Sequence, residues 1–76
     1  MDEEALNISV RKFLKKVGVT SQREIEAAFR DAMAKGRIDL ATHVYPAEAT
    51  IIVDALGLVV KIDGDLLLVS QNPGTQ

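Results

Sequence analysis

The sequence of 76 residues contains no cysteine and no tryptophan, and histidine occurs once, as His43. Without cysteine, disulfide bonds and thiolate metal sites are excluded, which fits a reducing cytoplasm. A single histidine also falls short of the ligand set of a zinc site. His43 has no evident partner that would make it a general base, so a solvated or structural role is expected. We expect neither a metal nor a cofactor.

Long apolar runs are also absent. The uninterrupted apolar stretches are about four residues long, whereas a membrane-spanning helix needs about 20. The N-terminal segment MDEEALNISV is acidic, whereas a secretory signal peptide begins with positive charge. We therefore expect a soluble, cytoplasmic protein without a membrane partner.

The sequence has no recognisable catalytic motif. Its five glycines are scattered and do not have the spacing of a phosphate-binding loop. The run Asp63-Gly64-Asp65 is too short for a calcium loop, and turn formation accounts for it. We expect that the protein is not an enzyme, that it has no catalytic residue, and that no small-molecule ligand is evident.

The charges are divided near Gly36. Residues 1–37 carry eight basic and six acidic side chains, a net charge of +2, and residues 38–76 carry one basic and five acidic side chains, a net charge of −4. This division bears on possible partners, but it does not identify a function.

Two apolar stripes at helical spacing predict two helices in the first half. The stripes are Leu6, Val10, Phe13, Leu14 and Val17, and then Ile25, Ala28, Phe29, Ala32 and Met33. Between them, Gly18 is typical of a helix end, and Ser21-Gln22-Arg23-Glu24 matches a capping box. We therefore predict a helical hairpin joined by Gly18-Val19-Thr20, with Gly36 ending the second helix.

Apolar runs in the second half of the sequence predict three strands, at Thr50–Val53, Leu58–Ile62 and Leu66–Val69. Asp54-Ala55-Leu56-Gly57 fits a four-residue turn, and Asp63-Gly64 favours a type I′ hairpin turn. Residues 38–47 are left open as a short extended segment or a packed loop.

The predicted fold is therefore α+β, with an N-terminal helical hairpin packed on a small antiparallel β-meander of about three strands. Residues 1–70 would form one domain, and residues 71–76 a disordered tail. One sheet face and eight helical residues would form the core: Leu6, Val10, Phe13, Leu14, Val17, Ile25, Phe29 and Met33.

Both faces of this predicted meander are apolar. One face would hold Ile51, Val53, Leu58, Val60, Leu67 and Val69, and the other Ile52, Val59, Leu66 and Leu68, with Thr50 and Lys61. Two helices cover only one face, so residues 38–47, a second copy of the chain or another protein must cover the second. The leading hypothesis is a non-enzymatic protein-interaction module that self-associates as a homodimer or binds a protein partner. Its candidate interface is Ile52, Val59, Leu66 and Leu68.

The alternative hypothesis is nucleic-acid binding by a helix-turn-helix-like hairpin with Gly18 in the turn. The candidate contacts are Arg11, Lys12, Lys15, Lys16, Arg23 and Arg30. A net charge of −2 and acidic residues on the same helix argue against it, because phosphate binding normally needs a positive surplus. A third helix, which such units generally need, is also missing.

The segment NISVRKFLKKVGVTSQREIE, from Asn7 to Glu26, resembles a family of small bacterial proteins of unknown function. The likeness covers residues 1–37 and continues more loosely through Ala55-Leu56-Gly57-Leu58 and the closing strands. The resemblance implies a bacterial, cytoplasmic, stand-alone α+β domain. It implies no activity, cofactor or site residue, because likeness of fold does not carry function.

Overall fold

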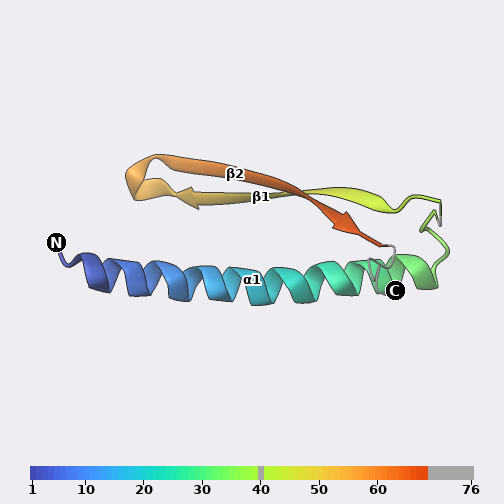
Figure 1. The fold of residues 1–76 in the computed structure, drawn as a ribbon, viewed down its shortest axis with the longest axis horizontal. Helices are drawn as coiled ribbons and strands as arrows, with labels where there is room; N and C mark the ends of the chain where they lie inside the picture. The colour runs from blue at the N-terminus through green and yellow to red at the C-terminus, as the bar shows by residue number, and fades with distance from the viewer. Residues whose placement is uncertain (40, 69–76) are drawn as a thin grey trace, which may run out of the picture. The chain divides into compact units, whose positions relative to one another are not determined.

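The structure is a computed structural model that describes residues 1–39 and 41–68. In this part the elements are helix α1 (Glu3–Ala34), strand β1 (Val44–Val53), the short 3-10 helix η1 (Asp54–Leu56) and strand β2 (Leu58–Leu67) (Figure 1). The chain divides into two compact units, a helical unit (Met1–Ile38) and a hairpin unit (Asp39–Gln76). The predicted α+β class is confirmed. The predicted tail at residues 71–76 lies outside the described residues.

Helix α1 begins with a side-chain cap. The Ala5 N–H donates to Oδ1 of Asp2, the N-cap residue, over 3.0 Å. Glu3 and Glu4 follow in the first turn, where negative charge favours the positive end of the helix dipole. These are the local signals that start a helix at this point.

The prediction of a helical hairpin is wrong, because α1 runs without a break for 32 residues, or about 48 Å. Gly18 lies inside the helix, and so does the expected capping box that starts at Ser21. An interior glycine costs about 1 kcal/mol, whereas a break would leave several backbone groups without partners at each new end. Gln22 supports continuity, since its Nε2 donates to Oε2 of Glu26 over 3.0 Å, one turn further on.

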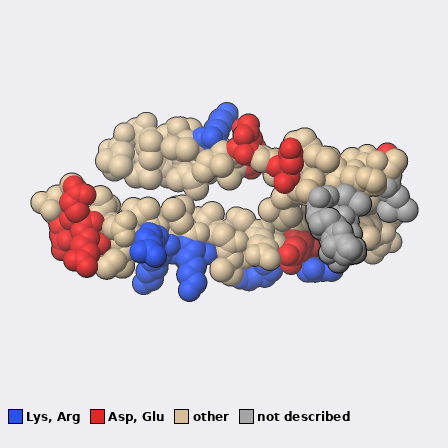
Figure 2. Space-filling model, viewed as in Figure 1, with Lys and Arg blue, Asp and Glu red and all other residues tan. Residues whose placement is uncertain are grey.

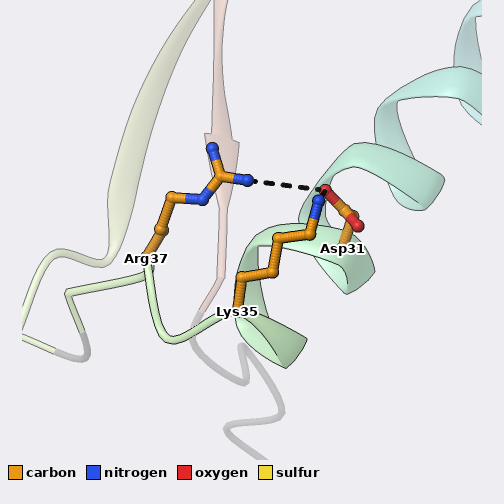
Figure 3. A network of polar contacts seen from close by, with 3 residues as sticks. All are labelled: Asp31, Lys35 and Arg37. Atoms are coloured by element: carbon orange, nitrogen blue, oxygen red, sulfur yellow. Dashed lines mark ion pairs between the residues drawn. The ribbon is translucent and has the colours of Figure 1, made fainter.

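The predicted helix end at Gly36 is confirmed. Gly36 has a φ of 67°, and its N–H donates to the Met33 carbonyl over 3.1 Å. The Arg37 N–H donates to the Ala32 carbonyl over 2.8 Å, which completes a Schellman motif. Asp31 lies beside this end: its Oδ2 is 3.1 Å from Nζ of Lys35 and 3.9 Å from an Nη of Arg37 (Figure 3).

The hairpin unit opens with a turn built around Asp39. Its Oδ1 accepts the Ala41 N–H over 2.9 Å, and its carbonyl accepts the Thr42 N–H over 2.9 Å. The Tyr45 hydroxyl donates to the same carbonyl over 3.4 Å. Residues 38–47, which the sequence left open, therefore contain this turn and, from Val44, the start of β1.

Strands β1 and β2 pair antiparallel over their full length, from Val44 opposite Leu67 to Val53 opposite Leu58. The predicted turn at Asp54–Gly57 is confirmed: η1 occupies it, and Gly57 closes it at a φ of 59°. The Gly57 N–H donates to the Asp54 carbonyl over 3.0 Å. A positive φ is what makes glycine the natural residue here.

The predicted turn at Asp63-Gly64 is wrong, and so is the third strand that depended on it. Both residues lie within β2, where Asp63 is opposite Glu48 and Gly64 is opposite Ala47. Gly64 does not have the positive φ that a type I′ turn requires. β2 therefore joins the second and third predicted strands, and Val69 lies outside the described residues.

Neither unit by itself forms a hydrophobic core from the residues that the structure describes. None of their side chains is buried. Of the eight helical residues predicted for the core, Val17 and Phe29 are half-buried and the rest are exposed, among them Phe13 at 51%. The predicted core, which was to form between the helices and one sheet face, stays a prediction.

Candidate interaction surfaces

One face of the β-hairpin is apolar along its whole length. Side chains alternate between the faces of a strand, so the register assigns each residue to a face. We use the term apolar hairpin face for Tyr45, Ala47, Ala49, Ile51, Val53, Leu58, Val60, Ile62, Gly64 and Leu66. No charged residue interrupts this face.

The opposite face is mixed in character. It carries Val44, Pro46, Glu48, Thr50, Ile52, Val59, Lys61, Asp63, Asp65 and Leu67. The prediction of two apolar faces is therefore wrong. It assumed a turn at Asp63-Gly64, and pairing these residues within β2 instead moves Leu66 to the apolar face and Leu67 to the mixed one.

The four residues of the predicted interface do not share a face. Ile52 and Val59 are opposite one another on the mixed face, where they are 59% and 60% exposed. Leu66 is opposite Tyr45 on the apolar hairpin face. Leu68 follows β2, and its N–H donates to the His43 carbonyl over 2.9 Å.

Sequence reasoning missed the extent of the apolar hairpin face, in particular Tyr45, Ala47 and Ile62. The signal was available, because apolar residues alternate with others from Tyr45 to Ile51. Exposed members of this face include Ile62 at 56% and Leu58 at 40%. A contiguous apolar surface of this kind is typical of an interaction site.

The two apolar stripes of the sequence lie on one continuous helix. Because successive residues are about 100° apart, the second stripe is displaced about 85° around α1 from the first. The adjoining edges of the two stripes, together with Gly18 and Ser21, form a straighter line along the helix axis. We call this line the α1 seam, and it consists of Val10, Leu14, Gly18, Ser21, Ile25, Ala28, Phe29 and Ala32. They lie within about 100° of the circumference, and the same arc also holds Glu3, Asn7 and Arg11 nearer the N-terminus.

The six basic residues proposed to contact nucleic acid all lie on α1, although the helix-turn-helix that was to present them is absent. At about 100° per residue they fall within about 140° of the helix circumference. They are Arg11, Lys12, Lys15, Lys16, Arg23 and Arg30. Figure 2 shows the Lys and Arg side chains gathered along one side of the helix, with acidic residues at its N-terminal end.

Two shallow hollows lie on this basic side. One is lined by Ile8, Arg11, Lys12 and Lys15, and the other by Val19, Gln22, Arg23, Glu26 and Arg30. Both are formed by side chains of one helix, so each is an open depression between neighbouring turns. A groove of this kind can receive an elongated partner but does not enclose a small molecule.

Groups that could carry chemistry are dispersed in the structure. In residues 1–39 and 41–68, no cluster of three or more His, Cys, Asp or Glu side chains is placed to hold a metal ion. His43 is exposed, in the loop before β1. Among the helices described, none combines the length and apolar character needed to cross a membrane.

Comparison with known proteins gives a match to a protein family. The model of a family of unknown function (DUF6494) matches residues 1–69. No curated protein and no solved structure matches the chain.

Proposed function

The chain belongs to the family of unknown function DUF6494, and we propose that this member is a non-enzymatic protein-interaction module that associates with a second copy of itself. The observation that carries the proposal is that neither unit by itself buries a described side chain, although each has an apolar face. An isolated helix or two-stranded hairpin is only marginally stable in water, so each gains from a partner.

Ile51 and Ile52 offer a matched pair of substitutions, since they are neighbours on opposite faces of β1. We expect wild-type protein to sediment as a dimer and Ile51→Glu to raise the dissociation constant at least tenfold, because the glutamate would place a charge in the interface. Ile52→Glu should leave the dissociation constant nearly unchanged. Sedimentation velocity over a hundredfold range of concentration measures all three.

Each result decides between surfaces. If Ile52→Glu dissociates the dimer and Ile51→Glu does not, the interface is the Ile52–Val59 pair predicted from the sequence, and the apolar hairpin face is excluded. If the wild-type protein is a monomer at the highest concentration, self-association is wrong. Circular dichroism of both variants separates loss of association from loss of folding.

Nucleic-acid binding is a second candidate, favoured by the basic side of α1. A continuous helix gathers six cationic residues on one side, where they could follow a phosphate backbone. The variant Lys12→Gln/Lys15→Gln/Lys16→Gln should then weaken binding of a DNA duplex or single-stranded RNA, and added salt should weaken it further. Lys35→Gln is the control, since Lys35 lies off this side. Fluorescence anisotropy that shows no binding at 50 mM salt would exclude this candidate.

A further inference from the structure

We infer that two copies of the chain pair through the outer edges of their β2 strands, which run antiparallel with Ile62 opposite the partner's Ile62. The two hairpins would then form one four-stranded sheet. This inference rests on the proposed self-association and adds the place where the two copies meet. Three observations carry it: the open edge of β2, the position of Pro46 on β1, and the charges along β2.

The register shows which backbone groups point away from the hairpin. In an antiparallel pair, residues that exchange both hydrogen bonds alternate with residues whose N–H and carbonyl groups point outward. The Leu68 N–H donates to the His43 carbonyl, and these two residues continue the register of β1 and β2 by one position. The outward-pointing groups therefore belong to the residues of the mixed face. On β2 these residues are Val59, Lys61, Asp63, Asp65 and Leu67.

The two outer edges of the hairpin differ. In residues 1–39 and 41–68 the sheet has two strands, so each strand has one edge that no other strand pairs with. Pro46 is at an outward-pointing position of β1 and has no N–H to donate, and proline on an edge strand hinders pairing. β2 contains no proline, and its outward-pointing residues are exposed. The edge of β2 is therefore the better one for accepting another strand.

The charges of β2 match those of a second copy in one register. With Ile62 opposite the partner's Ile62, Lys61 lies opposite the partner's Asp63, and the two-fold axis repeats this pair. Outward-pointing groups must meet outward-pointing groups, so the register shifts only in steps of two residues. A step in one direction sets Asp63 opposite its own copy, and a step in the other sets Lys61 opposite its own copy. Like charges directly opposite are destabilising, so the pattern favours the register centred on Ile62.

The pairing also compensates a like-charge contact within the hairpin. Asp63 lies opposite Glu48 of β1, so two acidic side chains are neighbours on the mixed face. In the proposed sheet the partner's Lys61 lies on the other side of Asp63, where an opposite charge is stabilising. Charged side chains on an edge strand normally discourage pairing with other chains, whereas these favour a second copy of the same chain.

Edge pairing keeps the apolar side chains together. The register preserves the alternation of side chains, so the two apolar hairpin faces lie on the same side of the four-stranded sheet, and Ile51 stays on that side. A two-stranded hairpin is only marginally stable by itself, whereas independent stability needs three or more strands with a hydrophobic face. A second copy therefore supplies the strands that each hairpin lacks.

Hydrogen exchange at single amides tests the edge directly. In the dimer, the amides of Val59, Lys61 and Asp63 should exchange at least about tenfold more slowly than those of Glu48 and Thr50. Glu48 and Thr50 are the matched control, because their N–H groups also point outward but lie on the edge of β1. Both sets are measured in one sample, so a general change of stability does not affect the comparison.

The outcomes separate this inference from the proposed function. Rapid exchange of the β2 amides in a chain that sediments as a dimer overturns the inference and leaves self-association standing. Protection of the β1 amides in place of the β2 amides also overturns it. A monomer overturns both, and protection of the β2 amides in a monomer would assign this edge to residues of the same chain.

Two proline substitutions test the same edge. Val59 and Ile52 lie opposite one another with their N–H groups pointing outward, so neither proline removes a hydrogen bond within the hairpin. Val59→Pro should raise the dissociation constant by about tenfold, because each copy loses one backbone hydrogen bond to its partner. Ile52→Pro should leave the dissociation constant nearly unchanged. Equal effects of the two variants in sedimentation velocity would overturn the inference.

Complementary charge variants test the register. Lys61→Asp makes both positions of the Lys61–Asp63 pair acidic, and Asp63→Lys makes both basic, so each variant alone should dimerise about tenfold more weakly. An equimolar mixture should recover the wild-type dissociation constant, because opposite charges meet again in the mixed pair. Asp63→Lys also removes the like-charge contact with Glu48, so weaker association of this variant would not come from a weaker hairpin. A mixture no stronger than its components would overturn the inference.

Discussion

Glu48 lies directly opposite Asp63 in the β1–β2 pair, so two acidic side chains meet across the hairpin. Like charges opposite one another destabilise a strand pair, by an amount comparable to what opposite charges contribute. We expect Glu48→Lys to stabilise the hairpin by about 0.5–1 kcal/mol and to raise the midpoint of thermal unfolding. Thr50→Lys is the control, because Thr50 is opposite Lys61 and the new pair would be repulsive. Thermal unfolding followed by circular dichroism should move the two midpoints in opposite directions, and equal shifts would contradict the register.

Gly18 lies inside α1, where glycine is a poor helix former, and a Cβ atom added there would meet nothing within 4 Å. Gly18→Ala should therefore stabilise the helix by up to about 1 kcal/mol. Gly18→Pro is the opposite control, because proline removes a backbone hydrogen bond and breaks a helix interior. Helical content measured by circular dichroism should rise in the first variant and fall in the second. Unchanged helical content in Gly18→Pro would indicate that the helix breaks at Gly18, as the sequence predicted.

Gly36 and Gly64 provide a matched comparison of backbone roles. Gly36 has a φ of 67° in the Schellman motif, so Gly36→Ala should lower the free energy of unfolding by about 1 kcal/mol. Gly64 lies in β2 without a positive φ, and an added Cβ would meet nothing within 4 Å. Gly64→Ala should therefore be neutral or slightly stabilising. Urea unfolding compares both variants, and a larger loss at Gly64 would indicate that the turn predicted from the sequence forms after all.

The cap at Asp2 predicts that two substitutions at this position differ in their effect on the stability of α1. Asp2→Ala removes the acceptor of the Ala5 N–H and should destabilise the start of α1 by about 1 kcal/mol. Asp2→Asn keeps a capping oxygen and should retain most of this stability. Hydrogen exchange at the Ala5 amide reports the effect directly. Equal protection in the two variants would show that the side chain of Asp2 does not cap the helix.

The sequence identified the helical and strand-forming regions but not where each one ends. Asp63-Gly64 matches a hairpin turn as well as Asp54–Gly57 does, yet only the second forms a turn. A turn at Asp54–Gly57 lets residues 44–49 pair with residues 62–67. It places the odd-numbered residues from Tyr45 to Val53, all of them apolar, on one face. A local turn signal cannot show whether a distant segment competes for the same strand.

The helix shows the same difficulty. Gly18 and the Ser21–Glu24 box are local signals for an end and a start, and both are overridden by the continuity of the backbone hydrogen bonds. Both apolar stripes do lie on a helix. Because the second stripe is displaced around the helix axis from the first, the sequence was interpreted as two helices and not as one. The basic candidates lie on one side of α1. The apolar candidates are divided between two faces, because the predicted turn at Asp63-Gly64 does not form and Leu66 lies further along β2.

If a second copy covers the apolar faces, as proposed, the absence of buried side chains within each unit bears on the abundance of the protein. Association that stabilises only the folded form makes the folded fraction rise with the concentration of the chain. At chain concentrations above the dissociation constant, most copies would be associated and would persist. At lower concentrations, more copies would be separate and open to proteolysis. The amount of protein in the cell would therefore regulate its own lifetime, without a dedicated degradation signal.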